Sequence, residues 1–170
     1  MRNALIIGFA LGLAACLPSL NWREVHPPGA SAVLLFPCKP VFDERPAAAG
    51  QGAMGLAQCE AGPASYSLSW ADVGEPARVG GALRAMTEAM AAKLKAPLPR
   101  GEVLVVAGMT PQPEAVQHRF QTPGVNARSA VFAHGATVYQ LLRVSPDDDL
   151  NAWDNFVASL RVGSAVQTGR

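Results

Sequence analysis

Large apolar and small side chains alternate from residue 66 to residue 71, and this pattern constrains the fold more than any other. The segment reads Tyr-Ser-Leu-Ser-Trp-Ala. A period of two is typical of a strand that buries one face. The serines could make the second face functional. Because no general base accompanies them, we interpret it as a solvated or closely covered face of a sheet.

Further segments predict a mostly antiparallel sheet around this strand. Residues 32–36 read Ala-Val-Leu-Leu-Phe, a continuous apolar run expected of a strand buried on both faces. Residues 46–53 are expected to form a flexible connection, and Pro123-Gly124 and Gly135 indicate chain reversals. The other predicted strands are residues 54–60 and 101–107, followed by a three-strand meander at 115–120, 127–132 and 137–144.

A long helix is predicted after Glu75-Pro76, where a proline in the first turn costs little. Its apolar side chains recur at helical spacing and end before Pro97 and Pro99. We expect this stripe to pack against the sheet, although its two methionines could instead form an adaptable binding surface. The stripe consists of Val79, Leu83, Met86, Met90 and Leu94.

A second helix is predicted near the C-terminus. Ser145 is expected to be its N-cap and Pro146 its first residue, with Asp147, Asp148 and Asp149 near the positive end of the helix dipole. An acidic triplet can also bind a metal ion, but capping explains it and the spacing is not that of a calcium loop. The expected buried stripe is Leu150, Trp153, Phe156, Val157 and Leu160, after which residues 161–163 run into a polar tail.

The N-terminus resembles the signal of a bacterial lipoprotein. An apolar run over residues 4–13 follows Arg2, is too short to span a bilayer, and ends in Leu13-Ala14-Ala15-Cys16. This motif is similar to a lipobox, which implies removal of residues 1–15 and a diacylglycerol on Cys16. Residues 16–31 would then be a tether that becomes ordered near Trp22. Leu17 is not the aspartate associated with retention in the inner membrane, which favours the outer membrane.

Two cysteines remain if Cys16 carries lipid. Cys38 and Cys59 would lie in an oxidising compartment, and we expect them to form a disulfide. Two separate buried thiols are the alternative. A zinc site is disfavoured because no histidine lies at ligand spacing from either cysteine.

Composition limits the class of protein. The chain has 170 residues, of which 49% are hydrophobic and 16% charged, which suits one globular domain over residues 32–163 and a short tail over 164–170. Of the 14 Lys and Arg side chains only Arg2 would be removed with the signal, so the rest balance the 13 Asp and Glu. A neutral mature chain argues against nucleic acid as a partner.

The order of elements and several local motifs resemble the sandwich fold named after PsbP, the extrinsic subunit of photosystem II. The motifs are Trp-Arg-Glu-Val from residue 22, Phe-Pro-Cys-Lys-Pro from residue 36 and Ser-Trp-Ala-Asp-Val from residue 69. They are similar to those of uncharacterised proteobacterial envelope lipoproteins, and the resemblance covers about residues 21 to 163. It implies a single-domain α+β sandwich with a mostly antiparallel sheet, a long central helix and a C-terminal amphipathic helix.

No motif predicts catalysis. The sequence has no Gly-x-Ser-x-Gly elbow, nucleotide loop or metal-binding helix motif, and the resemblance supplies no catalytic residue. His118 could be a ligand or a base, but we interpret it as a hydrogen-bonded histidine at the margin of the sheet. We therefore expect no cofactor and no enzyme activity. The expected protein is a lipid-anchored, periplasm-facing module that binds or supports an envelope partner. The alternative is a small-molecule-binding or hydrolytic envelope enzyme.

The lipobox predicts that the substitution Cys16→Ala blocks lipid labelling and normal maturation. Two acyl chains anchor a protein stably, because each buried methylene contributes about 0.8 kcal/mol. Metabolic labelling with a radioactive fatty acid, followed by N-terminal sequencing, checks this. Release of the unmodified protein from membranes by a salt wash, or a mature N-terminus elsewhere, would contradict it.

Overall fold

The computed structural model describes residues 20–163. The expected signal, Cys16, the first part of the tether and the tail over 164–170 lie outside these residues. Among the residues that the structure describes, no helix is both long and apolar enough to cross a membrane.

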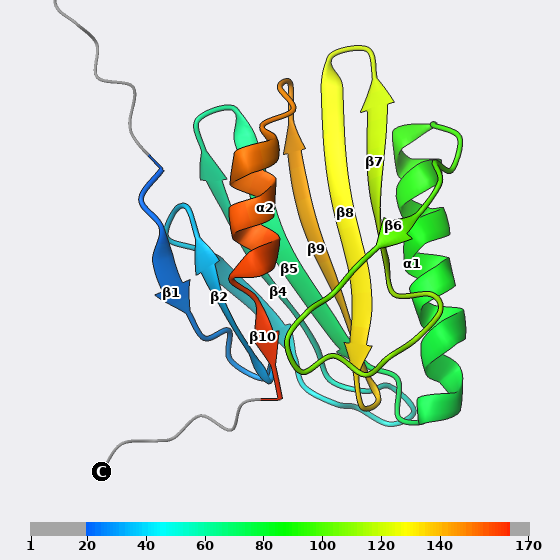
Figure 1. Ribbon diagram of the computed structural model, residues 1–170. Helices are drawn as coiled ribbons and strands as arrows, with labels where there is room; N and C mark the ends of the chain where they lie inside the picture. The colour runs from blue at the N-terminus through cyan, green and yellow to red at the C-terminus, as the bar shows by residue number, and fades with distance from the viewer. Residues whose placement is uncertain (1–19, 164–170) are drawn as a thin grey trace, which may run out of the picture.

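Two antiparallel sheets and two helices form the described part of the chain (Figure 1). The large sheet has seven strands in the order β3 (Val41–Arg45), β4 (Met54–Ala61), β5 (Ala64–Asp72), β9 (Thr137–Ser145), β8 (Val125–His134), β7 (Val116–Thr122) and β6 (Glu102–Val103). The small sheet has three, in the order β1 (Arg23–Val25), β2 (Ala32–Phe36) and β10 (Arg161–Val162). A 3-10 turn (Pro76–Arg78) leads into α1 (Val79–Leu94), and α2 is Leu150–Ala158. The predicted mixed fold with mostly antiparallel sheets is therefore confirmed.

Both faces of the large sheet are covered. Helix α2 and the small sheet lie over one face, as Figure 1 shows, and side chains such as Phe132 and Tyr139 point into the core between them. Helix α1 packs on the opposite face, against β7, β8 and β9, where Val131 and Val138 meet its apolar side chains. Successive residues of β8 and β9 thus enter different cores, as the period of two in a strand requires.

Phe156 of α2 lies at the centre of the larger core. Its side chain is fully buried, and its ring lies 5.2 Å from the ring of Phe36 and 5.4 Å from that of Tyr66, both in edge-to-face arrangements. Trp153 packs 6.5 Å away on the same helix. Edge-to-face aromatic contacts add to the free energy of burial. One side chain therefore joins α2 to a strand of each sheet.

The predicted β5 strand is confirmed. Tyr66, Leu68 and Trp70 are buried, whereas Ser67 and Ser69 on the other face are partly exposed. Gly55 lies opposite Trp70 in β4, and a side chain at residue 55 would lie only 2.1 Å from the indole ring. The glycine therefore creates the space in which Trp70 packs.

Residues 32–36 form β2 as predicted, and this strand is buried on nearly its whole length. The meander is also confirmed as β7, β8 and β9. In α1, Val79, Leu83 and Met90 of the predicted stripe are buried. Met86 and Leu94 are partly buried at the margin of the helix interface.

Three strands, β1, β3 and β10, were not predicted from the sequence. Every residue of β3 is exposed, so this edge strand shows no alternation, and β10 has only two residues, which pair with β2 from the far end of the chain. β1 pairs with β2 inside the segment expected to be the tether, and Val25 is buried, so the packed chain begins before residue 32. The strand predicted over residues 101–107 is reduced to β6. Leu104 and Val106 follow β6 and are buried in the larger core.

The prediction that Ser145 caps α2 is wrong. Ser145 is still paired with Asn126 as the last residue of β9, so the helix begins later. The N-cap is Asp149, whose carboxylate accepts a hydrogen bond of 3.0 Å from the backbone N–H of Ala152. Leu150 is consequently in the first turn and half-exposed rather than part of the buried stripe.

The packing around Phe156 predicts that Phe156→Ala lowers the free energy of unfolding by about 3–5 kcal/mol, because the truncation leaves a cavity that the two sheets cannot close. Chemical denaturation measures this. Leu150→Ala on the same helix is the control and should change stability by less than about 0.5 kcal/mol. Equal effects of the two substitutions would contradict the central position of Phe156.

Candidate functional site

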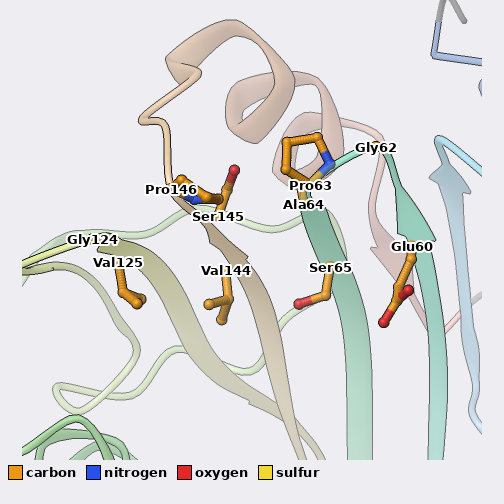
Figure 2. Close-up of a pocket in the computed structure, with 10 residues that line it drawn as sticks. All are labelled: Glu60, Gly62, Pro63, Ala64, Ser65, Gly124, Val125, Val144, Ser145 and Pro146. Atoms are coloured by element: carbon orange, nitrogen blue, oxygen red, sulfur yellow. The ribbon is translucent and has the colours of Figure 1, made fainter.

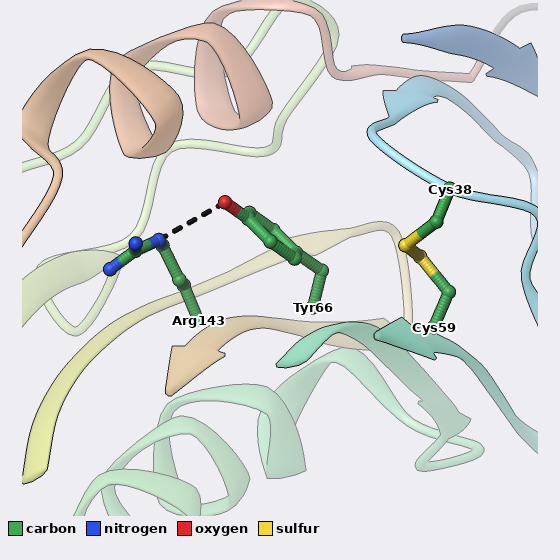
Figure 3. Close-up of a disulfide and its surroundings, with 4 residues drawn as sticks. All are labelled: Cys38, Cys59, Tyr66 and Arg143. Carbon is green, nitrogen blue, oxygen red and sulfur yellow. Dashed lines mark hydrogen bonds between the residues drawn. A yellow bond between two sulfur atoms is a disulfide. The ribbon is translucent and has the colours of Figure 1, made fainter. Parts of the chain in front are cut away.

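A disulfide joins Cys38 and Cys59, whose Cα atoms are 5.9 Å apart (Figure 3). Cys38 follows the end of β2 and Cys59 lies in β4. The bond therefore links the small sheet to the large one, and in the structure the predicted pair is present. Cys59 is buried among the side chains of the larger core.

Arg143 lies close to this disulfide, on the other side of the Tyr66 ring, as Figure 3 shows. Only 3% of its side chain is exposed. Its Nε donates a hydrogen bond of 3.1 Å to the hydroxyl of Tyr66, and its Nη2 donates one of 2.5 Å to Asp147. The guanidinium carbon also lies 5.7 Å from the centre of the Tyr66 ring, a cation–π contact.

The charges of this network support one another. Burial tends to lower the pKa of Arg143, but its hydrogen bonds to Asp147 and Tyr66 outweigh burial and the pKa is raised. The same hydrogen bond from Arg143, with a second one from Ser145, lowers the pKa of Asp147. Arg143 and Asp147 therefore stay ionised as a neutral pair at physiological pH.

A cavity of about 620 Å³ opens beside this network. It lies between the N-terminal segment at Leu20 and Asn21, the end of β2, the turn between β4 and β5, and the start of α2. Its walls combine apolar groups with charged ones. Arg23 contributes to its lining, and the Nε of this side chain is buried without a hydrogen-bond partner in the structure. We take this cavity as the candidate ligand site.

A second hollow lies on the opposite face of the sheet, where turns and strand ends meet (Figure 2). Its volume is about 310 Å³. Ser65 and Val144 face each other from neighbouring strands at its floor, and Glu60 alone among its described lining residues is charged. Since no histidine lines it, a nucleophilic role for Ser65 has no base to support it.

His118 lies on β7, next to the edge of the large sheet, as predicted, and is 8% exposed. It borders a groove of about 410 Å³ between α1 and residues 98–101. Burial lowers its pKa, against the opposing charge of Glu102, so the imidazole is neutral at physiological pH. The hydrogen bond that we expected for its ring is not found among residues 20–163. The ring packs 6.0 Å from that of Phe120 instead.

The acidic triplet is explained only in part by capping, so the prediction that capping accounts for it is wrong. Asp149 caps α2, but Asp147 pairs with Arg143, and Asp148 receives hydrogen bonds of 2.6 and 3.1 Å from Arg128. Arg119 also lies 2.5 Å from Asp148. These arginines come from β7, β8 and β9, so the triplet attaches the start of α2 to the sheet. Within residues 20–163, no three His, Cys, Asp or Glu side chains are arranged to hold a metal ion.

No protein-family model matches the chain, and no curated protein matches its sequence.

Reduction of the disulfide is expected to destabilise the fold by about 3 kcal/mol, the entropy of closing a loop of this length, and to lower the melting temperature. Thermal unfolding with and without dithiothreitol measures the change. The double substitution Cys38→Ser and Cys59→Ser is the control, since the reductant should then have no effect. Two reactive thiols in the denatured, unreduced protein would contradict the bond.

Asp148→Asn is expected to lower the free energy of unfolding by about 1.5–3 kcal/mol at neutral pH, because the largely buried guanidinium of Arg128 loses its charged acceptor. The hydrogen bond from Arg128 is the main cause that holds the pKa of Asp148 below its ordinary 3.8. The folded state therefore favours the carboxylate, and this stabilisation is complete above pH about 4 and lost as the pH falls through the folded pKa.

The difference between wild type and Asp148→Asn should consequently shrink in acid. Denaturation curves at pH 7 and at acid pH check the trend. Asp154→Asn removes the same charge from an exposed position of α2 and is the control. A difference that stays constant with pH would contradict the ion pair.

Proposed function

We propose that this protein is a lipid-anchored, periplasm-facing module of the bacterial cell envelope that binds or supports another envelope component. The observation that carries the proposal is the conjunction of Leu13-Ala14-Ala15-Cys16 with a disulfide-bonded domain. Disulfides persist in oxidising compartments such as the periplasm, and a lipobox directs a protein there. The residue after the cysteine is Leu17 and not the aspartate associated with retention in the inner membrane, which favours the outer membrane. The antiparallel sheet, the helix in the middle of the chain and the C-terminal helix support assignment to the PsbP-like sandwiches.

The position of the cavity fits such an anchor. Leu20 and Asn21 border it, and Leu20 is the fourth residue after Cys16. An extended chain spans at most about 3.3–3.6 Å per residue, so the tether would reach about 14 Å. The end of the domain that carries the cavity would thus stay close to the lipid headgroups, and the opposite end would extend into the periplasm.

A protein partner has an accessible strand to bind. β3 pairs only with β4 in the described structure, and Val41 and Phe42 are 64% and 44% exposed. The free edge of a strand can accept an extended segment of another chain. The charged residues Asp43, Glu44 and Arg45 on the same strand disfavour indiscriminate pairing.

The alternative is a small-molecule-binding or hydrolytic envelope enzyme. The cavity beside the disulfide favours binding of a small molecule within this alternative. Hydrolysis has less support, because the serines at the hollow on the opposite face have no histidine beside them in the described residues.

Photo-crosslinking in intact cells tests the proposal. A photoreactive amino acid at Phe42 on the exposed edge strand should yield one specific adduct with an envelope protein. The same group at Lys93, exposed on α1, is the control and should not yield that adduct. Turnover of a substrate by the purified protein, abolished by one side-chain replacement, would overturn the proposal in favour of an enzyme.

A further inference from the structure

His118 is a buried side chain whose hydrogen-bonding capacity is not used within residues 20–163. It is 8% exposed, and neither nitrogen of its ring has a hydrogen-bond partner in this part of the chain. The polar side-chain atoms that are fully enclosed without a partner in the described structure do not include these nitrogens. They are therefore accessible from the groove that His118 lines, where a ligand can satisfy them.

Gly101 leaves room for a ligand beside the Nε2 atom of His118. A side chain at residue 101 would place its Cβ 3.2 Å from Nε2 and 3.2 Å from the side chain of Val116. All three residues line the groove. Because glycine has no Cβ, the approach to Nε2 stays open on this side.

The polar groups of the groove are acceptors of hydrogen bonds. Burial lowers the pKa of His118, so the imidazole is neutral and one of its ring nitrogens is an acceptor. Thr87 of α1 also lines the groove, and its hydroxyl donates a hydrogen bond of 3.1 Å to the carbonyl of Leu83. The hydroxyl oxygen of Thr87 can therefore only accept a further bond. The groove suits a ligand that donates hydrogen bonds.

The charges around the groove are mainly negative. Glu88 and Glu114 line it together with one cation, Arg84, whose guanidinium forms an ion pair with the carboxylate of Glu114. Glu88 is exposed and forms no ion pair with another described residue. Glu102 lies close enough for its negative charge to act on His118. A cation is therefore favoured in the groove over an anion.

The remaining walls are apolar and stiff. Leu98 and Val116 contribute aliphatic surface, and Pro99 and Pro113 restrict the backbone of the two segments that flank the groove. The volume of about 410 Å³ lies in the range of small-molecule sites, which combine apolar walls with a few polar groups. Stiff walls reduce the ordering cost of binding.

We propose that this groove binds a primary ammonium group carried on a short apolar stem. One N–H of the ammonium donates to Nε2 of His118, in the tautomer that leaves this nitrogen unprotonated, and Glu88 supplies the opposite charge. The stem lies against Leu98 and Pro113. A free amine and the lysine side chain of a partner share this chemistry. The groove is separate from β3 and from the cavity beside the disulfide, so the inference goes beyond the proposed function.

Nuclear magnetic resonance of the purified mature protein in nonionic detergent tests the site through the ¹⁵N resonances of the His118 ring. Butylammonium should shift these resonances saturably. Butanol lacks the charge, butyrate reverses it, and butyltrimethylammonium keeps it without an N–H donor, so each should bind more weakly. Nα-acetyllysine N-methylamide distinguishes the sources of the ligand. Tighter binding of this lysine than of butylammonium assigns the site to a partner's lysine, and otherwise the ligand is a free amine.

Variants of the groove give the decisive comparison. His118→Phe keeps a ring beside Phe120 but removes the acceptor, so the Kd of butylammonium should rise about 10-fold or more, the loss expected for a hydrogen bond to a charged group. Gly101→Ala keeps the imidazole and covers Nε2, so the Kd should also rise. Gly81→Ala adds the same methyl group to α1, where nothing lies within 4 Å, and should bind as the wild type does.

The contribution of charge has its own pair of variants. Glu88→Gln should raise the Kd, whereas Asp154→Asn removes a negative charge from an exposed position of α2, over the opposite face of the large sheet, and should leave it unchanged. Calorimetric titration with butylammonium measures both.

Four results would overturn the inference: no saturable binding of butylammonium, equally tight binding of butyrate, an unchanged Kd in Gly101→Ala, or equal losses in Glu88→Gln and Asp154→Asn. Gly101→Ala keeps the test decisive even if His118→Phe fails to fold. A lipidated protein that crosslinks through Phe42 but does not bind butylammonium would contradict this inference alone.

Discussion

The need to cover both faces of the large sheet shapes the whole molecule. Val131 and Phe132 are neighbours in β8, point in opposite directions, and are each at most 1% exposed. A strand of this kind is stable in water only if a separate layer lies over each face. Helix α1 supplies one layer, and α2 with the small sheet supplies the other. After the meander the chain therefore returns to the face opposite α1, where α2 and β10 complete the second layer.

The turn between β9 and α2 supplies hydrogen-bond acceptors for arginine side chains of the large sheet. Arg143 lies on a central strand and is almost completely buried. Its charge is tolerated because Asp147, at the turn that leads into α2, and the hydroxyl of Tyr66 satisfy its donors. The same turn brings Asp148 to Arg128. Ion pairs at the start of α2 and aromatic packing along it thus hold the helix in one position.

The cavity beside the disulfide is a consequence of the same arrangement. The disulfide holds the exit of β2 against β4, and Arg143 holds the start of α2 against β9. Between these two attachments the small sheet and the turn between β4 and β5 leave a space that Arg23 borders. Because the walls are fixed covalently and by buried hydrogen bonds, a ligand would meet a preformed site, which reduces the ordering cost of binding.

The sequence by itself determined the elements whose burial follows a local period. Tyr66, Leu68 and Trp70 are recognisable because alternate residues of a strand share a face, and Val79, Leu83 and Met90 because helix positions three or four apart do. It also indicated the pairing of Cys38 and Cys59, through the oxidising compartment that the lipobox-like motif implies.

Only the tertiary structure decided the rest. β3 is exposed throughout and β10 is two residues long, so neither carries a period, and the partners of Asp148 lie 20 residues or more away along the chain. The cavity is built from β1, the end of β2, the turn between β4 and β5, and the start of α2. No local pattern marks Arg23 as different from other arginines. The burial of its Nε without a hydrogen-bond partner is a property of the packing around it, which exists only after these four segments have come together.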